Sequence, residues 1–207
     1  MPSTGWHPEF QDVNNDGFTD LFISKGNVDS MPEYAAADPN NLLLGQPDGT
    51  FVEGAVDAGI VHYDRSRGAA LVDLNLDGVL DLVEVNRVEN VNLWRSIGSG
   101  DADGAAPMGN WLAIELVQPD VNLDGIGSWI EVKVGDHLVQ REVSIGGGHA
   151  GGQIVRTHIG LGPSGEAEIR VQWPDGVVGP WMTVDANQFV TITRDADAPQ
   201  IWTPVDG

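Results

Sequence analysis

A nine-residue acidic pattern occurs twice in the chain and constrains its fold more than any other feature. Asp-x-Asn-x-Asp-Gly-x-x-Asp begins at Asp12 and again at Asp73, 61 residues later. Apolar, strand-like sequence follows each copy. Repetition at this distance indicates two copies of one small unit. Units of this length, built from short strands and polar turns, are typical of β-propeller blades.

The oxygen atoms of each copy are spaced as in a calcium loop. They occupy positions 1, 3, 5 and 9, with a backbone carbonyl at position 7, and Ca²⁺ takes about six to eight oxygen ligands. Glycine at position 6 lets the chain turn sharply around an ion. We therefore predict two calcium sites. Their ligands are Asp12, Asn14, Asp16, the Phe18 carbonyl and Asp20 in the first loop, and Asp73, Asn75, Asp77, the Val79 carbonyl and Asp81 in the second.

Three carboxylates in one loop repel one another without a cation, so we expect metal binding to be coupled to folding. The alternative is a pair of plain Asp-Gly turns that bind no metal. The second loop also matches an EF-hand, because Glu84 stands at position 12. However, Ile23 stands there in the first loop, and both loops continue as strands rather than helices. We therefore expect Glu84 to be an outward-facing strand residue.

A third, partial copy of the pattern lies later in the chain. It has Asp120, Asn122 and Asp124, but Ser128 at position 9. A weak third calcium site is one interpretation, and a simple turn is the interpretation that we favour.

Composition divides the chain into four segments. We assign 1–98 to the calcium-loop repeats, the Gly- and Asp-rich segment 99–107 to a linker, 108–195 to a second β domain and 196–207 to a loosely ordered tail. Apolar and polar residues alternate in the second domain, which predicts strands. Their ranges are 111–117, 128–134, 138–143, 167–173 and 189–193.

The expected fold is therefore all-β, with about two incomplete propeller blades followed by a small β-sandwich-like domain. Two blades cannot close a ring, and they leave open strand edges. We expect the chain to be the C-terminal part of a larger propeller protein, or to complete its sheets with a partner or by self-association.

Charge and composition exclude several classes of protein. The chain has 31 acidic and 10 basic residues, a net charge of −21 and no cysteine. The basic residues are scattered, which argues against nucleic-acid binding. Disulfides and cysteine-based metal sites are excluded. A run of 18 apolar residues is also lacking, so we expect no membrane insertion.

Catalytic motifs are scarce. The five histidines form no close metal pair, and the sequence has no nucleophile elbow, phosphate loop or dinucleotide fingerprint. The glycine-rich segment 146–152 precedes a strand rather than a helix, so we expect a mobile loop that contacts a ligand. The seven tryptophans are either core residues or an exposed platform for a sugar or protein, and the sequence does not separate these alternatives.

The two acidic loops, with Asn41-Leu-Leu-Leu44 and Asp48-Gly-Thr-Phe51, resemble FG-GAP/VCBS repeats, the calcium-loop blades also found in integrin α propellers. Residues 111–176 resemble an ASPIC/UnbV domain, through Trp111-Leu-Ala-Ile, His158-Ile-Gly-Leu and Val171-Gln-Trp-Pro-Asp-Gly. The combination is similar to the cartilage-acidic-protein family and its bacterial secreted relatives. The family's glycine-rich loop carries a Tyr and a Ser-Gln pair, which His149-Ala-Gly-Gly-Gln153 replaces here.

The resemblance implies a calcium-binding, non-enzymatic binding or adhesion module that is secreted, extracellular or periplasmic. Its partner would be an extracellular protein or a glycan. One alternative is a carbohydrate-active or hydrolytic accessory domain in which His149 and nearby acids act. The other is a purely structural cap, in which 108–195 seals the end of a propeller.

Overall fold

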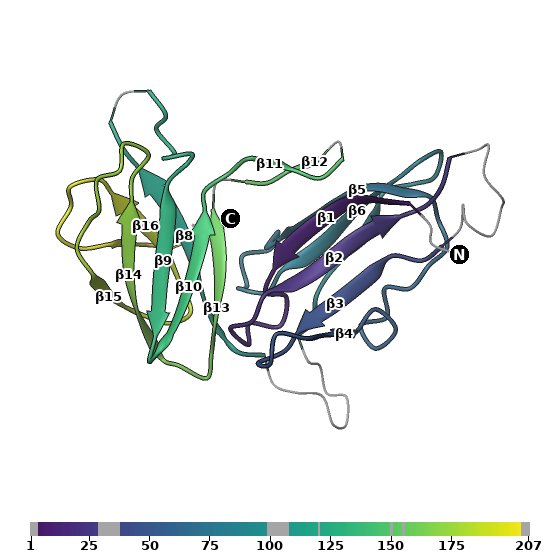
Figure 1. Cartoon of the computed structure of the whole chain (residues 1–207), viewed down its shortest axis with the longest axis horizontal. Helices are drawn as coiled ribbons and strands as arrows, with labels where there is room; N and C mark the ends of the chain where they lie inside the picture. The colour runs from purple at the N-terminus through teal and green to yellow at the C-terminus, as the bar shows by residue number, and fades with distance from the viewer. Residues whose placement is uncertain are drawn as a thin grey trace.

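A computed structural model describes residues 4–28, 38–98, 108–119, 121–149, 151–154 and 156–203. Within these ranges the chain forms seventeen strands and no helix, which confirms the all-β prediction. Strands β1–β7 form a repeat unit, and strands β8–β17 belong to a second, sandwich unit beside it (Figure 1). No described helix is long and apolar enough to cross a membrane.

The first blade is a four-stranded antiparallel sheet in chain order. Its strands are β1 (Gly5–Gln11), β2 (Asp20–Lys25), β3 (Asn41–Gly45) and β4 (Phe51–Glu53). Side chains of β2 alternate between buried and half-buried. Gln11 pairs with Asp20. The first acidic loop therefore joins the adjacent ends of β1 and β2.

The second blade has three strands: β5 (Ser66–Val72), β6 (Asp81–Asn86) and β7 (Asn92–Trp94). Val72 pairs with Asp81, so the second acidic loop has the same place in its blade as the first. An apolar cluster lies between the blades. It contains Phe22, Leu42, Ala55, Ala69, Leu71, Leu80 and Leu82. Among the described residues no strand pairs with the outer edge of β4 or β7, so the blades form an incomplete propeller.

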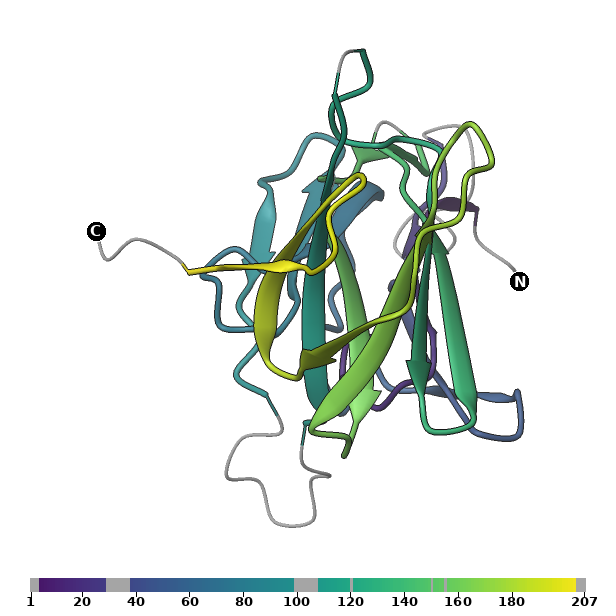
Figure 2. The same ribbon diagram turned by 90° about the vertical axis from the view of Figure 1, so that its left-hand side faces the viewer.

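The second unit is a sandwich of two four-stranded sheets, which face each other in Figure 2. One sheet has the order β13-β8-β16-β17, with β8 (Asn110–Val117), β13 (Thr157–Gly162), β16 (Gln188–Thr193) and β17 (Gln200–Trp202). The other has the order β10-β9-β14-β15, with β9 (Trp129–Val134), β10 (His137–Glu142), β14 (Glu166–Gln172) and β15 (Met182–Asp185). Only β8 and β16 pair in parallel among the described strands.

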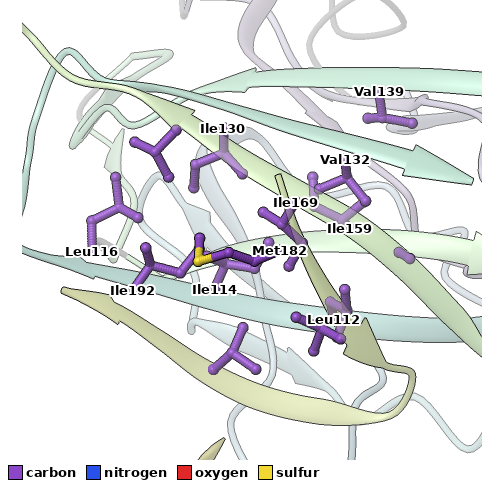
Figure 3. Packing of buried hydrophobic residues seen from close by; sticks show 14 of the residues in the cluster. Leu112, Ile114, Leu116, Ile130, Val132, Val139, Ile159, Ile169, Met182 and Ile192 are labelled. Carbon is purple, nitrogen blue, oxygen red and sulfur yellow. The ribbon is translucent and has the colours of Figure 1, made fainter. Parts of the chain in front are cut away.

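Alternating apolar residues fill the space between the two sheets (Figure 3). Leu112, Ile114 and Leu116 point inward from β8, and each is almost completely buried. Ile130 of β9 and Ile169 of β14 meet them from the other sheet. Burying one such side chain stabilises the fold by about 1.5–3 kcal/mol, so this core favours the association of the two sheets.

Two segments differ from the sequence analysis. Gln200–Trp202 was assigned to a loosely ordered tail, but it forms β17 because Phe189 and Val190 offer it the free edge of β16. The sequence predicts a loop over the glycine-rich segment, whereas the structure forms a short hairpin of β11 (Gly146–Gly147) and β12 (Gly151–Gly152), which extends over the repeat unit (Figure 1). Its mobility and its contact with a ligand stay predictions.

The tryptophans are divided between core and surface. Trp111 and Trp173 are buried, whereas Trp129, Trp181 and Trp202 are exposed by 37% or more. The guanidinium of Arg170 lies 4.4 Å from the ring centroid of Trp181. Arg156 lies 4.7 Å from that of Trp202. Such cation–π contacts hold these partly exposed rings in place through the attraction between the guanidinium and the face of the ring.

Candidate metal centre

The first acidic loop is closed by hydrogen bonds from its own backbone to its carboxylates. Asp12 accepts from the backbone N–H groups of Asp16 and Gly17, at 3.1 and 2.8 Å. Asp16 accepts from the N–H of Phe18 at 2.8 Å. Gly17 has φ +93°, a conformation that glycine adopts without steric cost. The four predicted side-chain ligands therefore come together in one turn, with Asp20 at its end.

The second loop repeats these three hydrogen bonds. Asp73 accepts from the N–H groups of Asp77 and Gly78 at 3.1 and 2.8 Å, and Asp77 accepts from Val79 at 3.0 Å. Gly78 has φ +85°. In both loops the position 3 asparagine donates to the position 5 aspartate. Two loops in different blades thus adopt one geometry, because they share one pattern of residue types.

The position 9 aspartates connect each loop to the rest of its blade. Asp20 accepts from the N–H groups of Val13 and Gly45, both at 2.8 Å. Asp81 accepts in the same way from Leu74 and Ser96. Each carboxylate oxygen retains a second lone pair for another partner.

Crowding and burial make the negative charge of these loops costly. Burial raises the pKa of Asp12 to about 7, and the nearby charges of Asp16 and Asp20 add to the rise. Burial and the charge of Asp16 raise the pKa of Asp20 to about 6. The pKa of Asp73 is raised as well, chiefly by burial. A cation in the loop would favour the ionised carboxylates and reverse these shifts.

These observations fit a hard cation. The donor set is carboxylate, amide and carbonyl oxygen throughout, which suits Ca²⁺. Within the described ranges, however, no three His, Asp or Glu side chains are already arranged around a metal position. The carboxylates bind backbone N–H groups instead. The side chains of each loop lie together in one turn, but calcium binding and the ten ligand positions stay a prediction.

The partial third copy is a turn in its described part. Asp120 lies outside the described residues. The Asn122 side chain accepts from the N–H of Ile126 and donates to its carbonyl, both at 2.9 Å. Asn122 adopts φ +67°, which asparagine tolerates better than most residues. This geometry favours the turn interpretation.

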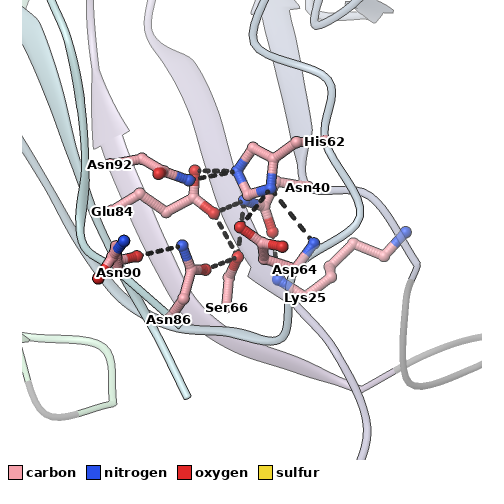
Figure 4. Close-up of polar contacts among 9 residues, drawn as sticks. All are labelled: Lys25, Asn40, His62, Asp64, Ser66, Glu84, Asn86, Asn90 and Asn92. Atoms are coloured by element: carbon pink, nitrogen blue, oxygen red, sulfur yellow. Dashed lines mark hydrogen bonds and ion pairs between the residues drawn. The ribbon is translucent and has the colours of Figure 1, made fainter. Parts of the chain in front are cut away.

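Glu84 corrects one prediction. It lies in strand β6, as expected, but it is completely buried rather than facing outward. Its carboxylate accepts from Asn40 at 2.6 Å and from Ser66, and it contacts His62 Nε2 at 2.6 Å (Figure 4). Asn40 also accepts from the N–H of Lys25. Glu84 therefore belongs to a buried polar network between the two blades, not to an EF-hand.

The glycine-rich hairpin contacts a second buried polar pair. His7 Nε2 lies 3.0 Å from Glu9, and both side chains are about 1% exposed. Glu9 accepts from the N–H of Leu71 and from the side chain of Gln153, both at 3.0 Å. A Cβ at Gly151 would overlap the His7 ring, so the hairpin approaches this closely only with glycine. Glu9 thereby connects both blades and the sandwich unit.

No pattern in the sequence predicts the contacts that cover the first loop. Asp12 is 3% exposed because β13 of the sandwich unit packs on it, and a Cβ at Gly160 would overlap its carboxylate. Arg141 donates to Thr19 Oγ1 at 2.5 Å. Burial lowers the pKa of Arg141, and the nearby charge of Asp12 opposes that shift. In the second loop, by contrast, the corresponding Asp73 is only half-buried.

Comparison with protein families gives two matches. Residues 12–84 match the family described as FG-GAP-like repeat, and residues 118–199 match the family described as ASPIC and UnbV. The first match includes both acidic loops, and the second includes most of the sandwich unit. A comparison with curated proteins gives no match.

Proposed function

This chain is an FG-GAP-like repeat protein with an ASPIC/UnbV domain, and on that premise we propose that it is a calcium-stabilised binding module rather than an enzyme. One observation carries the calcium assignment: two loops in different blades share the same hydrogen bonds around the same all-oxygen donor set. Burial raises the pKa of their carboxylates, and a divalent cation would relieve that cost.

The residues that would hold calcium are the five ligand positions of each loop. Bound Ca²⁺ would neutralise the crowded carboxylates and stabilise the turn between the first two strands of each blade. Both loops lie close to the sandwich unit, so metal binding would stabilise the contact between the two units. We place the protein in an extracellular or periplasmic compartment, where weak calcium sites are filled.

The test is calorimetric titration of the whole chain with Ca²⁺, with Mg²⁺ as the control ion. We expect two Ca²⁺ per chain, one in Asp16→Ala or Asp77→Ala, and none in the double variant. At a hundredfold excess over Kd, each filled site should add about 2.7 kcal/mol of stability. Absence of binding at millimolar Ca²⁺ would reject the assignment and leave two metal-free turns.

We propose that the partner binds between the two units. A cleft of about 320 Å³ lies there, and ligand sites occur preferentially at domain interfaces. Phe10, Arg141, Gln153 and Arg156 are among its lining residues. Phe10 is 56% exposed and offers a ring for stacking. A glycan or extracellular protein would use this cleft, and Phe10→Ala should then reduce capture on a glycan or protein array without lowering the melting temperature.

The buried His–carboxylate pairs support a non-enzymatic role. His7–Glu9 and His62–Glu84 combine residue types common in catalysis, but their hydrogen bonds connect strands and units.

The structural cap is the second candidate function. The packing of β13 on the first loop favours it, because the sandwich unit covers one end of the blade pair. Failure of every array ligand to bind would favour the cap.

A further inference from the structure

The first acidic loop is attached to the sandwich unit through its backbone. Gly109 N–H donates to the Asn14 carbonyl at 3.0 Å, and Gly162 N–H donates to the Asn15 carbonyl at 2.9 Å. Both acceptors lie inside the predicted calcium loop, at positions 3 and 4. The loop's conformation therefore depends on two segments of the sandwich unit that are about 100 to 150 residues away in sequence.

Asn15 connects three parts of the molecule, although it is not a predicted ligand. It is 1% exposed and adopts φ +59°. Its side-chain nitrogen donates to the Gly78 carbonyl of the second loop at 3.1 Å. Its side-chain oxygen lies 2.6 Å from Nε2 of His158 in β13. Because Asn15 Oδ1 is an acceptor, His158 must carry its proton on Nε2.

His158 is itself fixed by packing. Its ring stacks on Trp111 with centroids 6.0 Å apart and planes 17° apart. Trp111 in turn contacts Gly78 so closely that a Cβ there would overlap the indole. Phe189 also packs edge-on against Trp111, with ring centroids 4.8 Å apart. The imidazole therefore cannot follow Asn15 if the loop moves. Instead it defines where Asn15, and the loop around it, must lie.

We propose that the ASPIC/UnbV domain completes the first calcium site: His158 is a positioning residue that holds Asn15, and thereby the ligand loop, in its metal-binding conformation. This inference rests on the calcium binding proposed above. By linkage, calcium in the first loop then strengthens docking of the sandwich unit to the same extent that docking strengthens calcium binding. In the second loop Leu76 replaces Asn15 at position 4, and it packs against the apolar cluster of Trp111, Ala113 and Phe189. Its side chain has no oxygen that could accept a hydrogen bond from a histidine.

The experiment isolates one loop at a time in the full-length chain. Asp77→Ala removes calcium binding at the second loop, so that only the first loop is measured. Asp16→Ala does the reverse. In each background we would titrate Ca²⁺ into the parent and into His158→Leu, which keeps the volume and removes the donor. We expect His158→Leu to weaken the first loop about tenfold, the effect of losing one buried hydrogen bond. The second loop should change less than twofold.

Two further variants separate positioning from folding. His158→Gln retains a side-chain N–H donor and should recover part of the lost affinity. Asn15→Gly accepts φ +59° without strain, removes only the side chain, and should weaken the first loop like His158→Leu. It also provides the test if His158→Leu does not fold. Near-ultraviolet circular dichroism would verify that each variant retains its packed aromatic residues.

The outcomes are distinct. If the Asp77→Ala parent binds no Ca²⁺, the calcium proposal fails, and this inference fails with it. If the parent binds but His158→Leu and Asn15→Gly leave the first-loop affinity unchanged, the calcium proposal holds and the positioning role is wrong. Equal weakening of both loops by His158→Leu would also overturn it, since that result indicates a general loss of structure.

Discussion

His158 is a buried histidine whose protonation the fold opposes. Burial lowers its pKa to about 4, whereas an unfolded histidine titrates near 6.5. Between pH 6.5 and 4, His158 is protonated in the unfolded chain but stays neutral in the folded chain. The free energy of unfolding therefore decreases as the pH falls through this window. We predict that the free energy of unfolding of the parent chain falls by roughly 2–3 kcal/mol more than that of the His158→Leu variant between pH 7 and 4.5. Urea unfolding at both pH values measures the difference, and equal losses would contradict the prediction.

Asp12 titrates in the opposite sense. Its pKa in the metal-free fold is about 7, above the unfolded value of 3.8, so the folded state gains protons first as the pH falls. A proton on Asp12 competes with calcium. We predict that the first-loop affinity, measured in Asp77→Ala, falls up to about tenfold per pH unit below 7. The second loop, measured in Asp16→Ala, should respond less because Asp73 is less buried. Equal Kd values for the first loop at pH 7.5 and 5.5 would exclude proton competition.

Gly160 shows how closely the two units approach. An added Cβ would overlap the Asp12 carboxylate and press on the Asn15 backbone. We predict that Gly160→Ala costs about 1–3 kcal/mol, in the range of other overpacking substitutions. Gly165→Ala is the matched control, because a Cβ there meets nothing within 4 Å. It should change stability by less than about 0.5 kcal/mol. Thermal unfolding of both variants measures the two stability changes. An unchanged stability of Gly160→Ala would contradict the prediction and mean that the interface shifts to accommodate the added Cβ.

At the scale of elements, the polar network of Figure 4 connects β6 to the chain entering β3. Glu84 accepts from Asn40 and Ser66 and contacts His62 while fully buried. Glu84→Gln replaces an acceptor oxygen by a donor and leaves a buried partner unpaired. We predict a loss of roughly 2–4 kcal/mol in denaturant unfolding.

The control for Glu84 is a carboxylate in an exposed ion pair. Glu168 lies 3.3 Å from Lys133, and both side chains are nearly half exposed. Glu168→Gln should cost less than about 0.5 kcal/mol. If the two variants cost the same, the network between the blades contributes no more than a surface pair.

Local patterns predicted the strands well because strand formation depends on near neighbours. Alternation over 111–117 and 128–134 corresponds to β8 and β9, and 189–193 corresponds to β16. Strand β17 was not predicted, since Gln200–Trp202 is too short to show an alternation of apolar and polar residues. It forms a strand because it pairs with the edge of β16. Glu84 was placed on the wrong face because its partner Asn40 is 44 residues away.

In the candidate metal site, too, local features could be predicted from the sequence, and contacts between distant segments could not. The shared geometry of the two acidic loops could be predicted, because each loop lies within nine residues of sequence. The ten calcium ligands themselves stay a prediction. The contact between Asn15 and His158 could not be predicted, since it spans 143 residues and the acidic pattern leaves the residue at position 4 unspecified. A buried asparagine with positive φ becomes recognisable only when the structure shows the acceptor and donor on either side.

At the scale of the whole molecule, the two units share more than a linker. Glu9 accepts hydrogen bonds from the N–H of Leu71 in the second blade and from the side chain of Gln153, which follows the hairpin. The backbone of the first loop accepts hydrogen bonds from Gly109, just before β8, and from Gly162 at the end of β13. The sandwich unit thus lies against the ends of both blades where their acidic loops emerge. We expect the units to unfold together when calcium is bound, since separating them exposes both loops.

The open blade edges are the remaining large-scale feature, and they predict self-association. Val52 on β4 and Leu93 on β7 are 54% and 67% exposed, and no described strand pairs beyond either one. An unpaired edge with apolar side chains is a template for another strand. Sedimentation velocity should therefore show a weight-average sedimentation coefficient that rises with protein concentration. Val52→Lys with Leu93→Lys should abolish the rise, because edge lysines block pairing, whereas Val121→Lys on the sandwich unit should not. A chain that stays monomeric at every concentration would show that the net charge of −21 already keeps these edges apart.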